Sequence, residues 1–143
     1  MIEKSLADGL ALARAGRYFE AHEAFEDAWR AASPDERDFF QGLVHVVVAW
    51  YQDGRGNEIG CGRQLEKAAR RLVAYAPRHR GVDVASLLAQ VERARPGAMP
   101  ELQLYVAEAD RVQDPPQADV EPPLTVEEEE QSERDEDEAA DDA

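Results

Sequence analysis

The stretch YFEAHEAFEDAWR, residues 18–30, decides how the chain is organised. On a helix turning about 100° per residue, His22 lies about 20° from Trp29 and about 40° from Glu26. Tyr18 belongs to the same stripe of large side chains. Such a stripe is the face that a helix buries against its neighbours. We therefore expect an imidazole and a carboxylate inside an aromatic face, where buried charges need partners.

Helical periodicity and helix-breaking residues recur along the chain on both sides of this stretch. Gly16 is suited to a left-handed helix end, Ser33 to Glu36 read as a capping box, and Asn57 reads as a helix cap. These signals predict a compact all-α bundle of five or six helices arranged as hairpins. The expected helices span residues 5–15, 17–32, 34–52, 58–76 and 83–95, with a sixth at 100–112 and a loop at 78–81.

The third expected helix, residues 34–52, is apolar around nearly its whole circumference and is therefore the central one. Its polar residues Gln41, His45 and Gln52 lie within about 40° of one another. Gly42 lowers helix propensity by about 1 kcal/mol relative to alanine. A glycine in such a helix predicts a close approach of a neighbour, which we expect to be the second helix near His22.

Residues 16–34 also fit the second-helix pattern of a tetratricopeptide repeat. A shift of 40 residues aligns five pairs: Gly16 with Gly56, Ala21 with Cys61, Phe25 with Leu65, Glu26 with Glu66, and Ala28 with Ala68. The period exceeds the usual 34 residues, so we expect two related hairpins rather than a true repeat array. His22 aligns with Gly62, and Trp29 aligns with Ala69. The pattern shared by the two hairpins therefore does not require a histidine or a tryptophan at these positions.

Charge separates the chain into two parts. Residues 114–143 hold 14 acidic residues and one basic residue, a charge of −13, which leaves −2 of the total −15 for the rest. We expect a helical domain at residues 1–113 and a disordered acidic tail at 114–143. The single cysteine excludes an internal disulfide, and no apolar run is long enough to span a bilayer. We expect no signal peptide and a cytoplasmic protein.

An ordered set of motifs resembles the bacterial and archaeal "domain of unknown function 309" family over about residues 5–95. That family has a small all-α fold, and it is sometimes labelled a predicted metal-dependent hydrolase. The resemblance therefore implies the same fold and makes that activity an expectation. The matching positions are Gly16, Tyr18, His22, Glu23, Glu26, Trp29, Arg30, Gln41, Gly42, Gly56, Asn57 and Gly60, followed by Gly81 and Asp83.

His22, Glu26 and His45 are the candidate metal ligands. Histidine and carboxylate at positions i and i+4 can share an ion, and zinc or another divalent metal needs at least three protein ligands. Bound water would then be the nucleophile and Glu23 a candidate base, which makes His22, Glu23 and Glu26 the candidate catalytic residues. The competing interpretation is structural: Glu26 orients His22 inside a satisfied polar network. The third interpretation is metal-free acid–base catalysis by His22 and Glu26.

Tyr18, Trp29, Gln41 and Asn57 are candidate pocket residues around this pair. Trp29 could form a wall on which a ligand stacks, although a large aromatic residue is more often core. A modest basic face is expected from Arg63, Arg70, Arg71, Arg78, His79 and Arg80. The body is nearly neutral and the acidic tail would compete for this face, so we expect no nucleic-acid partner.

Two functions therefore stay open from the sequence. The first is a metal-dependent hydrolase centred on His22, Glu26 and His45. The second is a non-catalytic, tetratricopeptide-like helical binding or scaffold module with a groove between its hairpins. The partner of either is a small molecule or a protein, and neither function involves a membrane.

Overall fold

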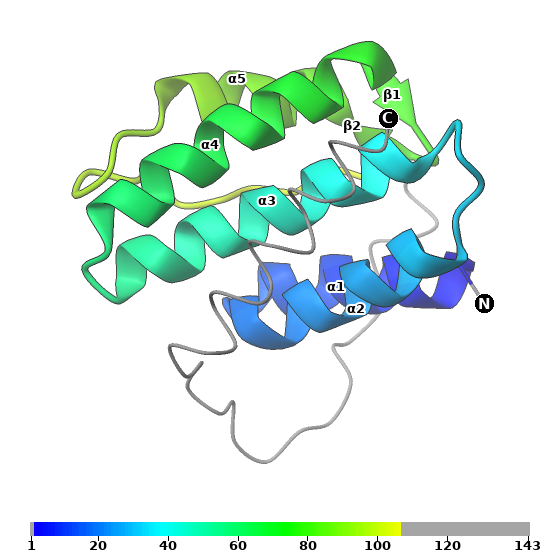
Figure 1. The fold of residues 1–143 in the computed structure, drawn as a ribbon, viewed down its shortest axis with the longest axis horizontal. Helices are drawn as coiled ribbons and strands as arrows, with labels where there is room; N and C mark the ends of the chain where they lie inside the picture. Colours follow the sequence, from blue (N-terminus) through cyan, green and yellow to red (C-terminus); the bar gives the residue numbers. More distant parts are fainter. Residues whose placement is uncertain (1, 107–143) are drawn as a thin grey trace.

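A computed structural model describes residues 2–106, and helices form most of this region (Figure 1). The expected all-α class is confirmed, with a two-stranded hairpin as the only sheet in the described part of the chain. None of the described helices is long and apolar enough to cross a lipid bilayer. The elements in order are α1 (Ile2–Arg14), α2 (Tyr18–Ala31), α3 (Arg37–Gly54), α4 (Glu58–Leu72), the 3-10 turn η1 (Val73–Tyr75), β1 (Arg78–His79), β2 (Val82–Asp83) and α5 (Val84–Arg93).

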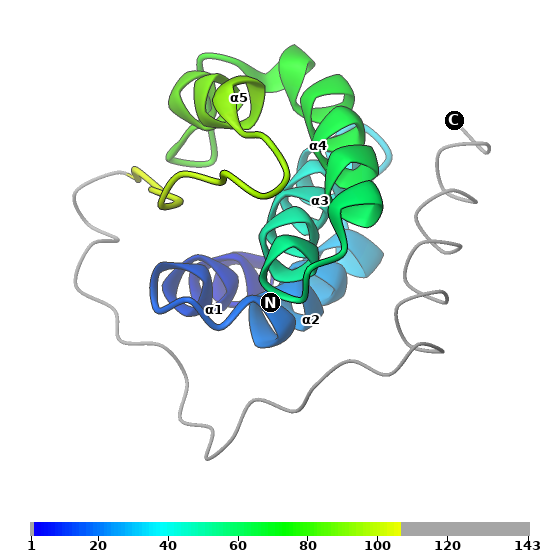
Figure 2. The same ribbon diagram turned by 90° about the vertical axis from the view of Figure 1, so that its left-hand side faces the viewer.

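Helix α3 lies at the centre, as its apolar sequence predicts. The α1–α2 hairpin packs on one side of it, and α4 packs on the other, with α5 beyond α4 (Figures 1 and 2). Phe39, Phe40 and Val44 of α3 are at most 1% exposed. One apolar core therefore joins both hairpins.

The turns of the two hairpins have the same backbone geometry 40 residues apart. Gly16 and Gly56 both adopt a left-handed backbone, with φ of +77° and +78°. A residue with a Cβ would be strained there, which is why glycine ends both first helices. Burial repeats too, because all six residues of the three aligned apolar pairs lie in the core: Ala21 and Cys61, Phe25 and Leu65, and Ala28 and Ala68. These observations support the expected relation between the hairpins. The matching hydrogen bonds are Gly16 N to Ala13 O and Gly56 N to Asp53 O, both 3.0 Å, and Arg17 N to Leu12 O and Asn57 N to Gln52 O, both 2.9 Å.

The predicted capping box at the start of α3 is wrong. Helix α3 begins only at Arg37, and no side chain caps it. Ser33 donates instead to Asp35, with 2.5 Å between Oγ and Oδ1. The carboxylate of Glu36 instead contacts Arg80 and His79 of the β1–β2 hairpin, and its charge-assisted hydrogen bond with Arg80 exceeds a neutral cap in strength.

The close approach at Gly42 occurs on a different side of α3 from the one expected. A Cβ built on Gly42 would lie 2.5 Å from Cγ of Leu72 on α4. The glycine therefore lets α3 and α4 meet, and the prediction that it brings the second and third helices together is wrong. Helical periodicity shows which residues face inward but not which neighbour they meet.

The C-terminal part of the described region departs furthest from the expectation. The expected loop at 78–81 contains β1, and the two strands pair antiparallel with Arg78 opposite Asp83. Residues 100–106 are not helical: Leu102 and Leu104 are buried, and the side chain of Gln90 exchanges hydrogen bonds with the backbone of Gln103 at 2.6 and 2.7 Å. The rest of the expected sixth helix and the expected tail, residues 114–143, lie outside the described residues.

Candidate functional site

His22 and Glu26 form an inward-facing pair on α2, as the sequence predicts. Their side chains are 9% and 12% exposed, and 3.3 Å separates His22 Nε2 from Glu26 Oε2. Arg30, one turn further along the helix, lies 3.6 Å from the other carboxylate oxygen of Glu26. The carboxylate therefore lies between an imidazole and a guanidinium on a single helix.

The charge state of Glu26 follows from these neighbours. Burial raises the pKa of the Glu26 carboxyl, but the hydrogen bond from His22 and the charges of His22 and Arg30 together outweigh it. The pKa therefore lies below its ordinary value. Glu26 is thus held as an anion with partners, which is how a protein tolerates a buried charge.

Aromatic rings flank the pair along the seam between α2 and α3. The ring centroid of Phe19 lies 6.3 Å from that of His22 and 6.3 Å from that of Tyr51 on α3. Trp29 is half-buried at the other end of α2, with the guanidinium of Arg37 5.8 Å from its ring centre. We call the line formed by Phe19, His22, Glu26, Trp29 and Tyr51 the α2–α3 strip.

His45, the third candidate ligand, contacts helix α4. It is 1% exposed, and its Nδ1 lies 2.7 Å from Oε1 of Gln64 on α4. His22 and Glu26 instead contact each other along α2. Within residues 2–106, no group of three His, Cys, Asp or Glu side chains is arranged to hold a metal ion. A metal site shared by His22, Glu26 and His45 stays a prediction.

The remaining candidate residues have diverse surroundings. Asn57 caps α4: its Oδ1 accepts from the backbone N–H of Gly60 at 2.9 Å, and its Nδ2 donates to Gln52 at 3.0 Å. Gln41 is 2% exposed in the core of the bundle, and Tyr18 is half-buried at the start of α2. Asn57 therefore has a structural role in capping the helix.

Glu23, the candidate base, is an exposed residue of α2. Partial burial raises the pKa of its carboxyl, neighbouring carboxylates raise it further, and His22 opposes them. A base role stays a prediction for this residue.

The sequence analysis missed an ionic cluster formed by Glu36, His79 and Arg80. The Glu36 carboxylate accepts from Arg80 Nε at 2.5 Å and Nη2 at 2.7 Å, and it lies 2.7 Å from Nε2 of His79. Hydrogen bonding to Arg80 is the largest cause that lowers the pKa of Glu36 to about 2, and His79 adds to it against the effect of burial. Glu36 lies 43 positions before His79 and 44 before Arg80, so no local pattern could have joined them.

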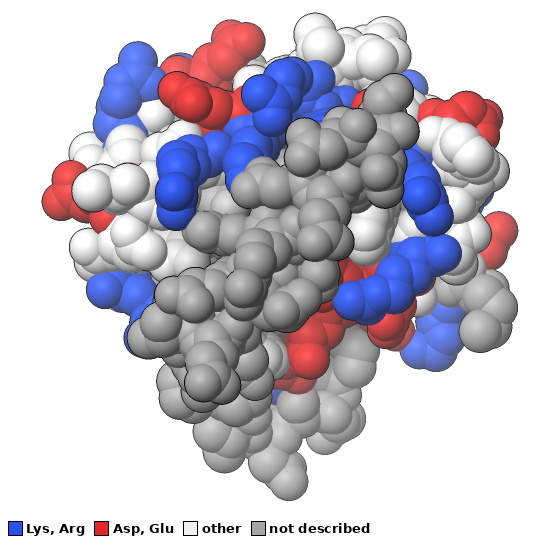
Figure 3. All heavy atoms as spheres, in the orientation of Figure 1, with Lys and Arg blue, Asp and Glu red and all other residues white. Residues whose placement is uncertain are grey.

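The expected basic face is divided by these contacts. Arg71 is buried and donates to Asp38 at 2.8 Å, and His79 and Arg80 are engaged by Glu36. Exposed cations remain along α4, and Figure 3 shows Lys and Arg side chains gathered over that helix. Three of the six residues expected on one basic face are thus held by two carboxylates, Arg71 by Asp38 and both His79 and Arg80 by Glu36.

Part of the chain is similar in sequence to known proteins. Residues 6–63, which run from the first half of α1 to the first part of α4, match the family described as "Domain of unknown function (DUF309)". The uncharacterized protein YpuF of Bacillus subtilis (strain 168) is 34% identical over 85 residues, which are 58% of this chain and 47% of YpuF. The chain thus spans about half the length of that curated relative.

Proposed function

We propose that this chain, whose residues 6–63 belong to the domain of unknown function 309 family, is a non-catalytic helical module that binds a protein partner. The observation that supports the proposal is that, among residues 2–106, no group of three His, Cys, Asp or Glu side chains is arranged to hold a metal ion. Glu26 is engaged by His22 and Arg30 along α2, whereas His45 contacts Gln64 between α3 and α4. Polar side chains that pair with one another inside a helical bundle stabilise its structure and need no catalytic role.

The binding surface in this proposal is the part of the α2–α3 strip that solvent reaches, which is formed by Trp29 and Tyr51, because Phe19, His22 and Glu26 are buried. Trp29 and Tyr51 are half-buried, and each has a guanidinium about 5.8 Å from its ring centre, from Arg37 and Arg55 respectively. Tryptophan, tyrosine and arginine are the residues that most often dominate binding energy at protein interfaces. Trp29 and Tyr51 with their two arginines therefore form the part of the strip that a partner helix can reach.

Charge specifies the partner further. Arg30, Arg37 and Arg55 are exposed along the edges of the strip. A complementary segment would combine apolar side chains with carboxylates, because opposite charges at the rim guide association and orient the partner.

A site-specific photocrosslinker tests this surface. The reagent is placed at Arg30, beside the strip, and in a matched control at Arg93, an exposed arginine of α5. We expect an adduct of one defined mass from position 30 and none from position 93. We also expect Arg37→Glu with Arg55→Glu to weaken the adduct, because both residues are exposed and the change reverses charge without touching the core. Equal crosslinking from both positions would contradict the proposal.

The metal-dependent hydrolase implied by the family resemblance is the competing hypothesis, and metal analysis separates the two. The module predicts the same unfolding midpoint with and without chelator. One metal ion per chain, lost in His22→Ala, would instead support the hydrolase. Glu26→Ala and Glu66→Ala form a matched pair, because Glu66 occupies the equivalent position in the second hairpin and is exposed. Loss of metal in the first and not in the second would overturn the module.

A further inference from the structure

Basic side chains line the solvent-exposed face of α4. Arg63, Lys67 and Arg70 follow one another at positions i, i+4 and i+7, which places them within about 60° of one another around the helix. Arg63 and Arg70 are exposed and Lys67 is half-buried, whereas the opposite face of the helix is buried in the core. We call these three residues the α4 basic stripe, and Figure 3 shows cations gathered over this helix.

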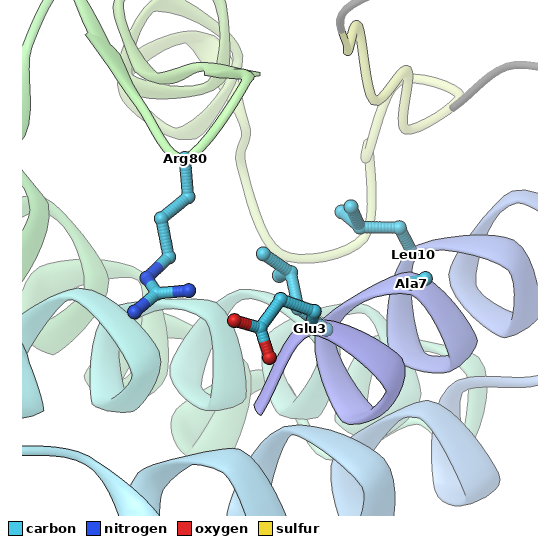
Figure 4. Close-up of a pocket in the computed structure, with 5 residues that line it drawn as sticks. Glu3, Ala7, Leu10 and Arg80 are labelled. Carbon is cyan, nitrogen blue, oxygen red and sulfur yellow. The ribbon is translucent and has the colours of Figure 1, made fainter. Parts of the chain in front are cut away.

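Positive charge prevails in this part of the chain. Residues 59–80 hold six basic residues and one acidic residue. Two of the six pair with carboxylates at the start of α3, Arg71 with Asp38 and Arg80 with Glu36. Figure 4 shows Arg80 extending from the hairpin toward α1, where it lines a pocket. The other four basic residues and the acidic one leave a charge of +3.

The most acidic part of the chain is connected closely enough to reach this stripe. Residues 127–142, which we call the acidic segment, hold 11 acidic residues and one basic residue, a charge of −10, and lie outside the described residues. The described region ends at Val106, which pairs with Val82 of the hairpin that follows α4. The 20 residues 107–126 can span up to about 66 Å, whereas the 15 residues of α4 are about 22 Å long. The acidic segment can therefore reach the whole stripe.

The charges of the other helices favour α4 as the docking surface. Helix α2 holds four acidic residues and one basic residue, Arg30, which lies 3.6 Å from Glu26 and 3.7 Å from Asp27. Its charge of −3 would repel an anionic segment. Among the described helices, only α4 has a net positive charge, with four basic and two acidic residues. The attraction of the whole helix therefore acts at the stripe.

We propose that the acidic segment docks on the α4 basic stripe of its own chain and keeps separate polyanions away from it. Its carboxylates accept hydrogen bonds from the guanidinium groups of Arg63 and Arg70 and from the ammonium group of Lys67. The summed charge of the stripe attracts a segment with many carboxylates, so docking does not require any one cation to be without another contact.

Covalent connection adds to this attraction. Because both partners belong to one chain, the acidic segment meets the stripe at an effective concentration that a separate polyanion has to match. The stripe shares no residue with the α2–α3 strip, so this inference stands apart from the proposed function.

Paramagnetic broadening in the full-length chain tests the docking. A nitroxide is attached to the cysteine introduced by Ser132→Cys, inside the acidic segment, and Cys61 stays unlabelled because it is fully buried. We expect the label to broaden the amide signals of residues 59–73 more than those of any other described element, and to the same extent after dilution. At about 0.5 M salt the broadening should fall, because the screening length is then only about 4 Å.

The pattern of broadening distinguishes this surface from other occupants and sites. Equal broadening from α1 to α5 would contradict docking at one site, and broadening centred on Trp29 and Tyr51 would place the segment on the α2–α3 strip instead. Labelled chains are also mixed with unlabelled, isotope-enriched chains. Broadening of α4 in the unlabelled chains would show that the occupant is the acidic segment of a second copy, which would overturn docking within one chain.

Arg70→Glu and Arg93→Glu form a matched pair that assigns the effect to the stripe. Both arginines are exposed and lie in the last turn of their helices, α4 and α5, so both changes lose the same interaction with the helix end. We expect Arg70→Glu to reduce the broadening of α4 about 3-fold, the size that exposed ion pairs predict, and Arg93→Glu to leave it unchanged.

A change in the acidic segment tests the same contact from the other side. Replacing residues 127–130, four glutamates, by glutamine should also reduce the broadening of α4, because it removes charge beside the label and changes no described residue. Unchanged broadening in this variant or in Arg70→Glu, or an equal loss in Arg93→Glu, would refute the assignment.

Discussion

Replacing Gly42 by alanine tests whether α3 and α4 pack as closely as the structure shows. The new methyl carbon would lie 2.5 Å from Cγ and 2.6 Å from Cδ2 of Leu72, distances that require one of the helices to move. Leu72 is fully buried and is held by the core on its other sides, so it cannot simply rotate away. We therefore expect Gly42→Ala to destabilise the protein.

The magnitude follows from two opposing effects. Extra volume in a packed core costs about 1–3 kcal/mol, whereas alanine gains about 1 kcal/mol over glycine in a helix interior. Gly62→Ala on α4 is the matched control, because its methyl group would lie 3.8 Å from Pro96, an ordinary contact. Since both variants gain the same helix propensity, the difference between their free energies of unfolding isolates the steric cost. We expect that difference to be about 1–3 kcal/mol.

Urea unfolding, followed by far-ultraviolet circular dichroism, gives the free energy of unfolding of both variants. A difference of 1 kcal/mol corresponds to a shift of roughly 4 °C in the melting temperature of a domain of this size. The combination of Gly42→Ala with Leu72→Ala should recover part of the steric cost, because the second change removes the atoms that clash. If Gly42→Ala stabilises the protein as much as Gly62→Ala does, the close approach of α3 and α4 is refuted.

Three further predictions follow from single residues. Because the pKa of Glu36 is lowered to about 2 from an ordinary value of 4.5, its ion pairs stabilise the fold above about pH 4.5, and that contribution is lost as the pH falls toward 2. The stability difference between the protein and Glu36→Gln should shrink over that range in pH-dependent unfolding, and a constant difference would argue against the ion pair. Burial raises the pKa of the Cys61 thiol to about 11. A thiol reagent at about pH 8 should therefore react with Cys61 only after urea unfolding. Rapid labelling of the folded protein would contradict this. Asn57→Ala should cost about 0.5–2 kcal/mol through loss of the cap on α4, measured by thermal unfolding, and an unchanged midpoint would show that the cap is dispensable.

The sequence by itself determined the features that depend on neighbouring residues. Gly16 and Gly56 end their helices in the left-handed conformation expected of them, and Asn57 caps α4. The inward placement of His22 and Glu26 was also predictable, because helical periodicity determines which side chains share a face. The 40-residue relation between the hairpins was visible for the same reason, since each turn is closed by hydrogen bonds within five residues.

Only the tertiary structure decided which distant groups meet. Glu36 belongs to a local capping pattern, yet its carboxylate binds Arg80, 44 residues away, because a bidentate ion pair is stronger than a neutral cap. Gly42 faces Leu72 of α4 rather than α2, and His45 contacts Gln64 on that same helix. Periodicity gives the direction of a side chain around its own axis, but the helix found in that direction depends on how the whole core packs.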